Sequence, residues 1–216
     1  MTKVLAGVEG TSSTMAASEV VKQVELAEED ALRAHMYRLL ARFLARPPGE
    51  RELALAADMG GDESDLGTAI GAFARIAGKS PAEMVAREYH DLFVGVGRGE
   101  LLPYASYYLT GFLHEKPLAR LRDDMARLGI ARQDTVKEPE DHIAALFEMM
   151  AGLIVGEFGT VASLEDQKQF FTTHVGSWAK HFFKDLEGAK ASVLYAALGS
   201  VGRIFMDIEE MAFTMD

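Results

Sequence analysis

The sequence predicts an all-α protein, a single globular helical domain of about nine to eleven helices. Apolar residues recur at helical spacing along most of the 216 residues, and proline or glycine separates the periodic segments. Alternating strand patterns joined by turn dipeptides are essentially absent. We expect residues 26–216 to form this domain, and residues 1–25, which contain Gly, Ser and Thr, to be a mobile tail.

Start and stop signals place the individual helices. Pro47 ends the first helix, because proline lacks a donor and clashes with the preceding turn. Ser80 and Glu83 form a potential capping box, and Pro139 is expected to open a later helix with acids in its first turn. The expected helices span about 27–45, 50–58, 65–77, 80–93, 106–115, 117–128, 139–151, 163–174, 178–186 and 189–211.

Composition excludes several classes of protein. The net charge of -11 disfavours nucleic acid and anionic lipid as partners. The absence of cysteine excludes disulfides, iron–sulfur clusters and thiol catalysis, and it fits a reducing compartment. No apolar run approaches the roughly 20 residues of a membrane span, and the N-terminus lacks the apolar region of a secretory signal. We therefore expect a cytoplasmic location and no stable membrane insertion.

The most informative stretch is residues 88–111. Tyr89, Leu92 and Phe93 share one helical face, and glycines at 95, 97 and 99 then end the helix. An aromatic segment follows, although loops are usually polar. A helix end, a glycine turn and an aromatic segment together predict one wall of a groove. Taken alone, the aromatic face is more typical of a plain core than of a binding surface.

Two motifs along the chain are informative. The first reads Tyr89-His90-Asp91-Leu92-Phe93, then Gly95, then Pro103-Tyr104-Ala105-Ser106-Tyr107-Tyr108-Leu109. The second, Glu-Pro-x-Asp-His, reads Glu138-Pro139-Glu140-Asp141-His142. In sequence and order, and in an acidic chain with helical patterning, the two motifs resemble the TorD/DmsD family of redox-enzyme maturation chaperones. Tyr89 replaces a tryptophan of some members, and Tyr104-Ala105 replaces another aromatic and glycine.

The resemblance implies a non-enzymatic chaperone that binds the twin-arginine leader and apoprotein of a molybdopterin-dependent oxidoreductase until its cofactor is inserted. The client is open among formate dehydrogenase and the reductases of dimethyl sulfoxide or trimethylamine N-oxide. A carboxylate at a groove mouth would receive a guanidinium. Carried over by motif, the expected peptide-binding residues are Tyr89, Leu92, Phe93, Pro103, Tyr104, Ser106, Asp141 and His142, with Glu88 and Asp91 as possible further acids.

Other functions remain as alternatives. One is a helical scaffold with a partner that is not exported. A helical metal-dependent enzyme is disfavoured, because no histidine has a glutamate three residues before it and no His-Glu-x-x-His occurs. The glycine turn lacks the spacing of a nucleotide fingerprint. We therefore expect no metal and no other cofactor, and either a monomer or a domain-swapped homodimer.

Overall fold

The structure, a computed structural model, describes residues 26–132, 137–190 and 192–215, so the predicted tail at residues 1–25 lies outside the described residues. The predicted all-α class is confirmed, since the described residues form ten α-helices and two π-helical segments, with one isolated β-bridge and no strand. The elements are α1 (Glu28–Ala45), α2 (Glu50–Ala57), α3 (Asp65–Ala77), α4 (Ala82–Tyr89), η1 (His90–Val94), α5 (Ala105–Thr110), α6 (Lys116–Arg127), α7 (Ile143–Val155), α8 (Leu164–Phe170), η2 (Phe171–Gly176), α9 (Ala179–Glu187) and α10 (Leu194–Met215).

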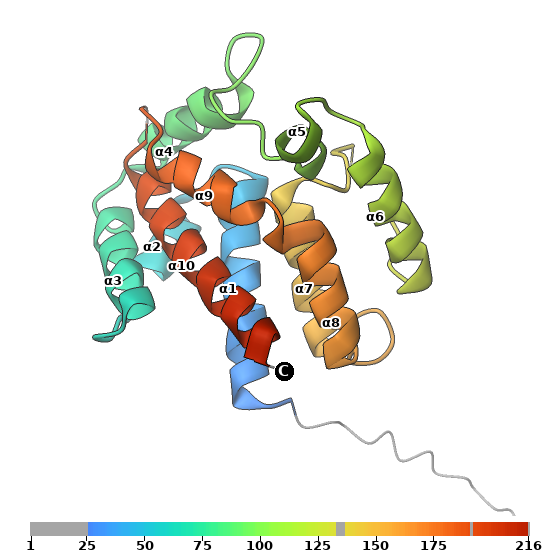
Figure 1. The fold of residues 1–216 in the computed structure, drawn as a ribbon. Coiled ribbons are helices and arrows are strands. Elements are labelled where there is room, and N and C mark those ends of the chain that lie inside the picture. Colours follow the sequence, from blue (N-terminus) through green and yellow to red (C-terminus); the bar gives the residue numbers. More distant parts are fainter. Residues whose placement is uncertain (1–25, 133–136, 191, 216) are drawn as a thin grey trace, which may run out of the picture.

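Helix α1 runs through the middle of the molecule, with α7 along one side and α10 crossing in front of it (Figure 1). Helix α10 also packs on α9 and α3, whereas α6 lies at the edge. The ring of Tyr37 on α1 makes edge-on contacts with Phe147 of α7 and Phe205 of α10, at centroid distances of 5.3 and 4.8 Å. Such aromatic packing joins α1, α7 and α10 in the core.

A polar seam also joins α1 to α10. The carboxylate of Glu209, 1% exposed, accepts hydrogen bonds from Arg33 Nε at 2.7 Å and Arg33 Nη2 at 2.9 Å. The Tyr37 hydroxyl donates to Glu209 Oε2 at 2.8 Å. Burial, followed by the Glu209 charge, raises the pKa of Tyr37 well above its usual value. We call these three residues the α1–α10 seam.

The glycine turn is shaped by close backbone approach. The chain leaves α4 through the π-helical segment η1, and Gly95 ends it with φ of 60°. A Cβ at Gly95 would lie 2.1 Å from the Arg98 carbonyl oxygen, so a side chain does not fit. The predicted helix end and glycine stop are therefore both found, with a π turn as the last piece.

Two predicted helix boundaries between residues 80 and 115 are wrong. The Ser80 hydroxyl donates to the Ile76 carbonyl at 2.8 Å instead of capping, and α4 begins at Ala82 with no side-chain cap. The helix expected to reach residue 115 ends at Thr110, because Gly111 turns into the left-handed region with φ of 82°.

Two later helix starts are also wrong, for tertiary reasons. Pro139 lies in a turn, and α7 begins four residues later at Ile143, where His142 Nδ1 accepts from the Ala144 N–H at 3.2 Å. Helix α10 begins at Leu194, later than the expected residue 189. Its first amides are capped by Glu88, which lies more than 100 positions away in the sequence.

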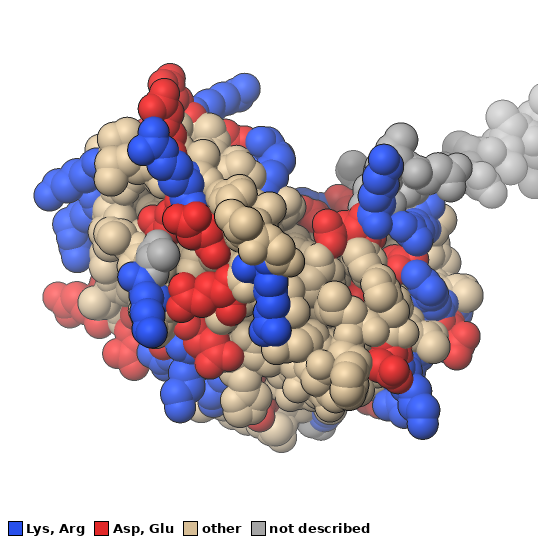
Figure 2. Space-filling view, turned by 90° about the horizontal axis from the view of Figure 1, so that it is seen from above, with Lys and Arg blue, Asp and Glu red and all other residues tan. Residues whose placement is uncertain are grey.

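On the end of the molecule seen from above, acidic and basic side chains are mixed on both sides of a broad area without charged groups (Figure 2). The net charge of -11 is therefore not concentrated on that face. Because exposed charges are screened within about 8–10 Å, local groups decide which ligand a pocket attracts. None of the helices in the described part of the chain has the length and apolar character that crossing a bilayer requires.

Candidate peptide-binding site

The two sequence motifs meet through their backbones. Tyr104 and His142 form an isolated antiparallel bridge. The Ala105 N–H donates to the Asp141 carbonyl at 3.0 Å, and the Ile143 N–H donates to the Pro103 carbonyl at 2.9 Å. The bridge therefore fixes the starts of α5 and α7 side by side, although the motifs lie more than 30 residues apart in the sequence.

Asp141 lies inside this junction. Its side chain is 1% exposed, and Oδ2 accepts from the Ser106 N–H at 2.8 Å, which caps the first turn of α5. Within the described ranges, Asp141 Oδ1 and the Ser106 hydroxyl oxygen are the two buried side-chain oxygens without a hydrogen-bond partner. The carboxylate thus keeps one acceptor oxygen free while the other holds the fold.

The rings of Tyr104 and His142 pack against each other beside this carboxylate. Their rings meet edge-on at 5.2 Å, and the Tyr104 hydroxyl donates to Glu138. Burial, helped by Glu138, raises the pKa of Tyr104. Burial lowers the pKa of His142 to about 4, against the opposing charges of Glu138 and Asp141. His142 is therefore neutral at pH 7, and because Nδ1 accepts from Ala144, its proton sits on Nε2.

A pocket of about 530 Å³ opens next to this junction. We call it the leader pocket. Its walls come from the ends of α1, α4 and α6, the second motif, the first two turns of α7 and the turn that follows α7. The lining residues are Ala45, Tyr89, Met125, Ile130, Ala131, Arg132, Glu138, Glu140, His142, Ala144, Ala145, Glu148, Met149, Glu157 and Phe158. Apolar side chains thus form most of the lining, and the charged residues are four glutamates and Arg132, whose guanidinium lies 3.4 Å from Glu140.

The four glutamates differ in their partners. Glu140 pairs with Arg122 at 2.8 Å, Glu157 pairs with Arg38, and Glu138 accepts from Tyr104. Glu148 has no hydrogen bond or ion pair with any residue that the structure describes. Burial, and secondarily the charge of Glu157, raises the pKa of Glu148, although Arg38 and Arg42 oppose this. A cationic ligand would relieve this unfavourable charge.

The structure brings only some of the predicted site residues to the pocket. Tyr89 and His142 line it. Leu92 is fully buried, and Phe93 packs against Tyr89 and Tyr195 at centroid distances of 5.0 and 5.5 Å. Of the remaining predicted residues, Pro103, Ser106 and Asp141 are buried, Tyr104 is half-buried at the motif junction, and none of these four lines the pocket. These residues hold the walls in place.

The two additional acids lie elsewhere. Glu88 Oε1 accepts from the Val193 and Tyr195 N–H groups at 2.9 and 2.7 Å, so it caps α10. Asp91 is exposed and lies 3.4 Å from the His90 ring. Neither acid lines the leader pocket.

Sequence reasoning missed Glu148 and Glu157. A signal for Glu148 was present, because Ala144 and Ala145 precede it by four and three residues on the same face of α7. Small neighbours leave room around a long acidic side chain. Glu157 carried no such signal, since it reaches the pocket only through the turn after α7. Among the residues with described positions, no three His, Asp or Glu side chains converge in a way that could hold a metal ion.

Comparison with known proteins agrees with this arrangement. The model of the nitrate reductase delta subunit family matches residues 60–184, more than half of the chain. The chain belongs to this family. Its relatives include the chaperone protein TorD of Vibrio cholerae serotype O1, 26% identical over 190 residues, which span 84% of this chain and 82% of that protein. TorD of Vibrio parahaemolyticus is 26% identical over 171 residues, 69% of this chain and 80% of the relative.

The fold of the family is also found in a solved structure. A putative redox enzyme maturation protein from Archaeoglobus fulgidus superposes with a TM-score of 0.53 at 23% identity, covering 82% of this chain and 94% of that one. The resemblance to TorD chaperones predicted from the two motifs is confirmed. The named relatives are chaperones, which is a non-catalytic role, so the prediction that this chain is not an enzyme is confirmed as well.

Proposed function

We propose that this TorD-family chaperone binds the twin-arginine leader of a molybdopterin-dependent oxidoreductase in the leader pocket, and holds the apoprotein in the cytoplasm until its cofactor is inserted. The supporting observation is Glu148, an exposed carboxylate at the largely apolar pocket beside the junction of the two motifs, which has no hydrogen bond or ion pair with a described residue. Leader bound to the chaperone is unavailable to the export machinery, so retention follows mass action.

The pocket suits the chemistry of such a leader. A guanidinium reaching Glu148 would gain charge-assisted hydrogen bonds, each with a net value of roughly 1.5–3 kcal/mol. Apolar leader residues would pack on Met125, Ile130 and Phe158. His142 would donate from Nε2 to a peptide carbonyl, because its other nitrogen is already used.

The residues of the two motifs then divide into two roles. Tyr89 and His142 would contact the leader directly, since they line the pocket. Asp141 and Ser106 are buried at the α5–α7 junction, so we propose that they position the contacting residues. Leu92 serves the same purpose inside the core.

Peptide titration tests this function. Leaders encoded next to the gene would be measured by calorimetry with Arg-Arg intact and with Lys-Lys in its place. We expect the intact leader to bind about tenfold or more tightly than the Lys-Lys form, because lysine cannot make the two-pronged contact. Absence of binding to every such leader, together with absence of binding to the apoprotein, would refute the proposal.

A matched pair of variants locates the site. Glu148→Gln should weaken leader binding by about tenfold or more, roughly 1.5–3 kcal/mol, since it removes the free carboxylate. Glu165→Gln is the control, because Glu165 is an exposed acid on α8 outside the pocket. If the wild type and Glu148→Gln bind the leader with equal affinity, the leader does not bind in this pocket, even if leader binding itself is observed.

A further inference from the structure

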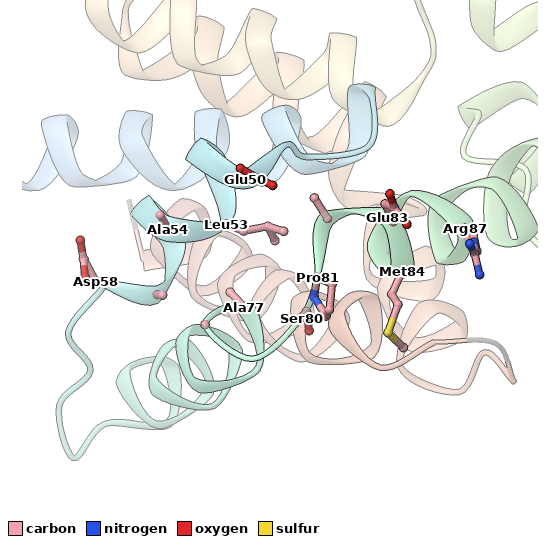
Figure 3. A pocket seen from close by; sticks show the side chains of 13 residues that line it. Glu50, Leu53, Ala54, Asp58, Ala77, Ser80, Pro81, Glu83, Met84 and Arg87 are labelled. Carbon is pink, nitrogen blue, oxygen red and sulfur yellow. The ribbon is translucent and has the colours of Figure 1, made fainter.

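A second groove lies between α2 and the segment that joins α3 to α4 (Figure 3). Its volume is about 820 Å³, larger than that of the leader pocket, and the two share no lining residue. Leu53 on α2 points toward the segment that carries Pro81. The groove lies outside both sequence motifs and plays no part in the proposed leader binding.

The floor of the groove is apolar and lined with small side chains. Leu53 and Ala77 are buried there, and Ala54 and Ala57 line the α2 side. Alanines let the backbone of a ligand approach closely, because helix-to-helix distance depends on the side chains at the contact. Met84, on α4, is 63% exposed. An exposed methionine beside a groove is an adaptable apolar contact.

Acids stand on both walls. Figure 3 shows Glu50 and Asp58 on the α2 side and Glu83 on the α4 side, with Arg87 farther along. None of these four charged groups has a hydrogen bond or ion pair from its side chain to another residue in the described ranges. By contrast Glu52, also on α2, pairs with Arg42 and Arg46. The groove therefore presents a net negative charge that nothing in the described chain neutralises.

We propose that this groove docks a helix of a partner protein, apolar on one face and flanked by basic side chains about two turns apart. The spacing follows from α2: eight residues separate Glu50 from Asp58, which corresponds to about 12 Å at a rise of 1.5 Å per residue. Basic residues about seven positions apart on a ligand helix match that distance. Apolar residues between them would lie against Leu53 and Met84. This is the helix-in-groove mode of recognition, with charge complementarity setting the register.

The test uses a designed helical peptide of about 15 residues, with leucines on one face and two lysines about seven positions apart. A matched peptide carries glutamate in place of both lysines. Fluorescence anisotropy of the labelled peptides with the whole protein should show the lysine peptide binding about tenfold or more tightly. Failure of the lysine peptide to bind, or equal binding of both peptides, would overturn the proposal.

Neutralising the walls should abolish this preference. The triple variant Glu50→Gln, Asp58→Asn and Glu83→Gln is expected to bind the lysine peptide about tenfold more weakly. The control triple changes three exposed acids outside the groove in the same way, Glu63→Gln, Asp123→Asn and Glu165→Gln. Equal loss in both triples would mean that only overall charge attracts the peptide, and the groove would carry no site.

Two further measurements separate this groove from the leader pocket. Ala54→Trp places a large side chain in the groove and should block the lysine peptide, while circular dichroism confirms that the helices are intact. Saturating leader peptide should leave lysine-peptide binding unchanged, because the two pockets have no residue in common. Displacement by the leader would make the groove an extension of the leader pocket and would overturn a separate docking site, whatever the outcome for leader binding.

Discussion

The α1–α10 seam and the leader pocket each contain a carboxylate, but the one in the seam is buried and the one in the pocket is exposed. In the seam, both oxygens of Glu209 are hydrogen-bonded, one to Arg33 and the other to Arg33 and Tyr37. In the pocket, Glu148 has no partner among the described residues. At the neighbouring junction, Asp141 keeps one oxygen unpaired in the described structure. A buried charge that is fully paired specifies the fold, whereas an accessible carboxylate without an ion-pair partner is available to a ligand.

The two regions should therefore respond to different changes. Loss of a partner in the seam leaves a buried charge uncompensated, which costs stability. Loss of a carboxylate in the pocket removes an unfavourable charge, so it should cost affinity and little stability. The predictions below test this division, beginning with the largest effect.

Glu209→Ala should give the largest loss of stability. The substitution leaves the half-buried Arg33 guanidinium and the buried Tyr37 hydroxyl without their main acceptor. Breaking a buried pair in this way costs about 3–5 kcal/mol, a substantial part of a typical domain's free energy of unfolding. Urea unfolding followed by circular dichroism would measure the change.

The adjacent residue provides the control. Glu210 is exposed, and its carboxylate lies 3.9 Å from Lys180, so Glu210→Ala should change the free energy of unfolding by about 0.5 kcal/mol or less. At temperatures where both variants remain folded, leader affinity should be unchanged. Weaker leader binding by folded Glu209→Ala would show that the seam also affects leader affinity, contrary to the division of roles between the two regions.

His142 should make stability depend on pH. Burial lowers its pKa from 6.5 to about 4, so the unfolded chain binds a proton that the folded chain excludes. Its contribution to stability is therefore present above pH 6.5 and is lost as the pH falls toward 4, by roughly 2–3 kcal/mol. Urea unfolding at pH 7 and pH 4.5 should show a smaller pH dependence in His142→Gln than in the wild type.

Other groups titrate in the same range, so a second histidine variant is needed. His181 is exposed on α9, and His181→Gln should retain the wild-type pH dependence. The same pH dependence in His142→Gln and the wild type would show that His142 is not held neutral by the junction.

Gly152→Ala should give the smallest effect. It should change the affinity for the leader more than the free energy of unfolding. A Cβ there would lie 2.4 Å from Phe158 Cε2, so the ring that lines the pocket must move. A gain in helix propensity of about 1 kcal/mol offsets part of the strain. Leader affinity should fall about threefold to tenfold, or about 0.7–1.4 kcal/mol. Gly188→Ala is the control, because its Cβ would meet nothing closer than 3.7 Å, and unchanged binding by both variants would show that Phe158 does not shape the site.

Local patterns predicted most of the helices. The helix boundaries that were predicted wrongly are ones that tertiary contacts set. The helix at residues 65–77 was placed correctly, and both its apolar spacing and the Ser64 cap found in the structure are local features. The start of α10 was not, since its cap is Glu88 from α4. Pro139 was expected to open α7, but the backbone bridge to Tyr104 keeps that segment in a turn.

The sequence by itself determined the helical class, the family resemblance and the two motifs that meet beside the leader pocket, because periodicity, glycine stops and motif spacing are properties of a linear chain. Only the tertiary structure decided which of those residues face the pocket. Burial depends on what packs against a residue from elsewhere in the chain, so Asp141 became an internal cap and Glu148 an open carboxylate. The acidic groove between α2 and α4 emerged in the same way, from side chains that share no local pattern.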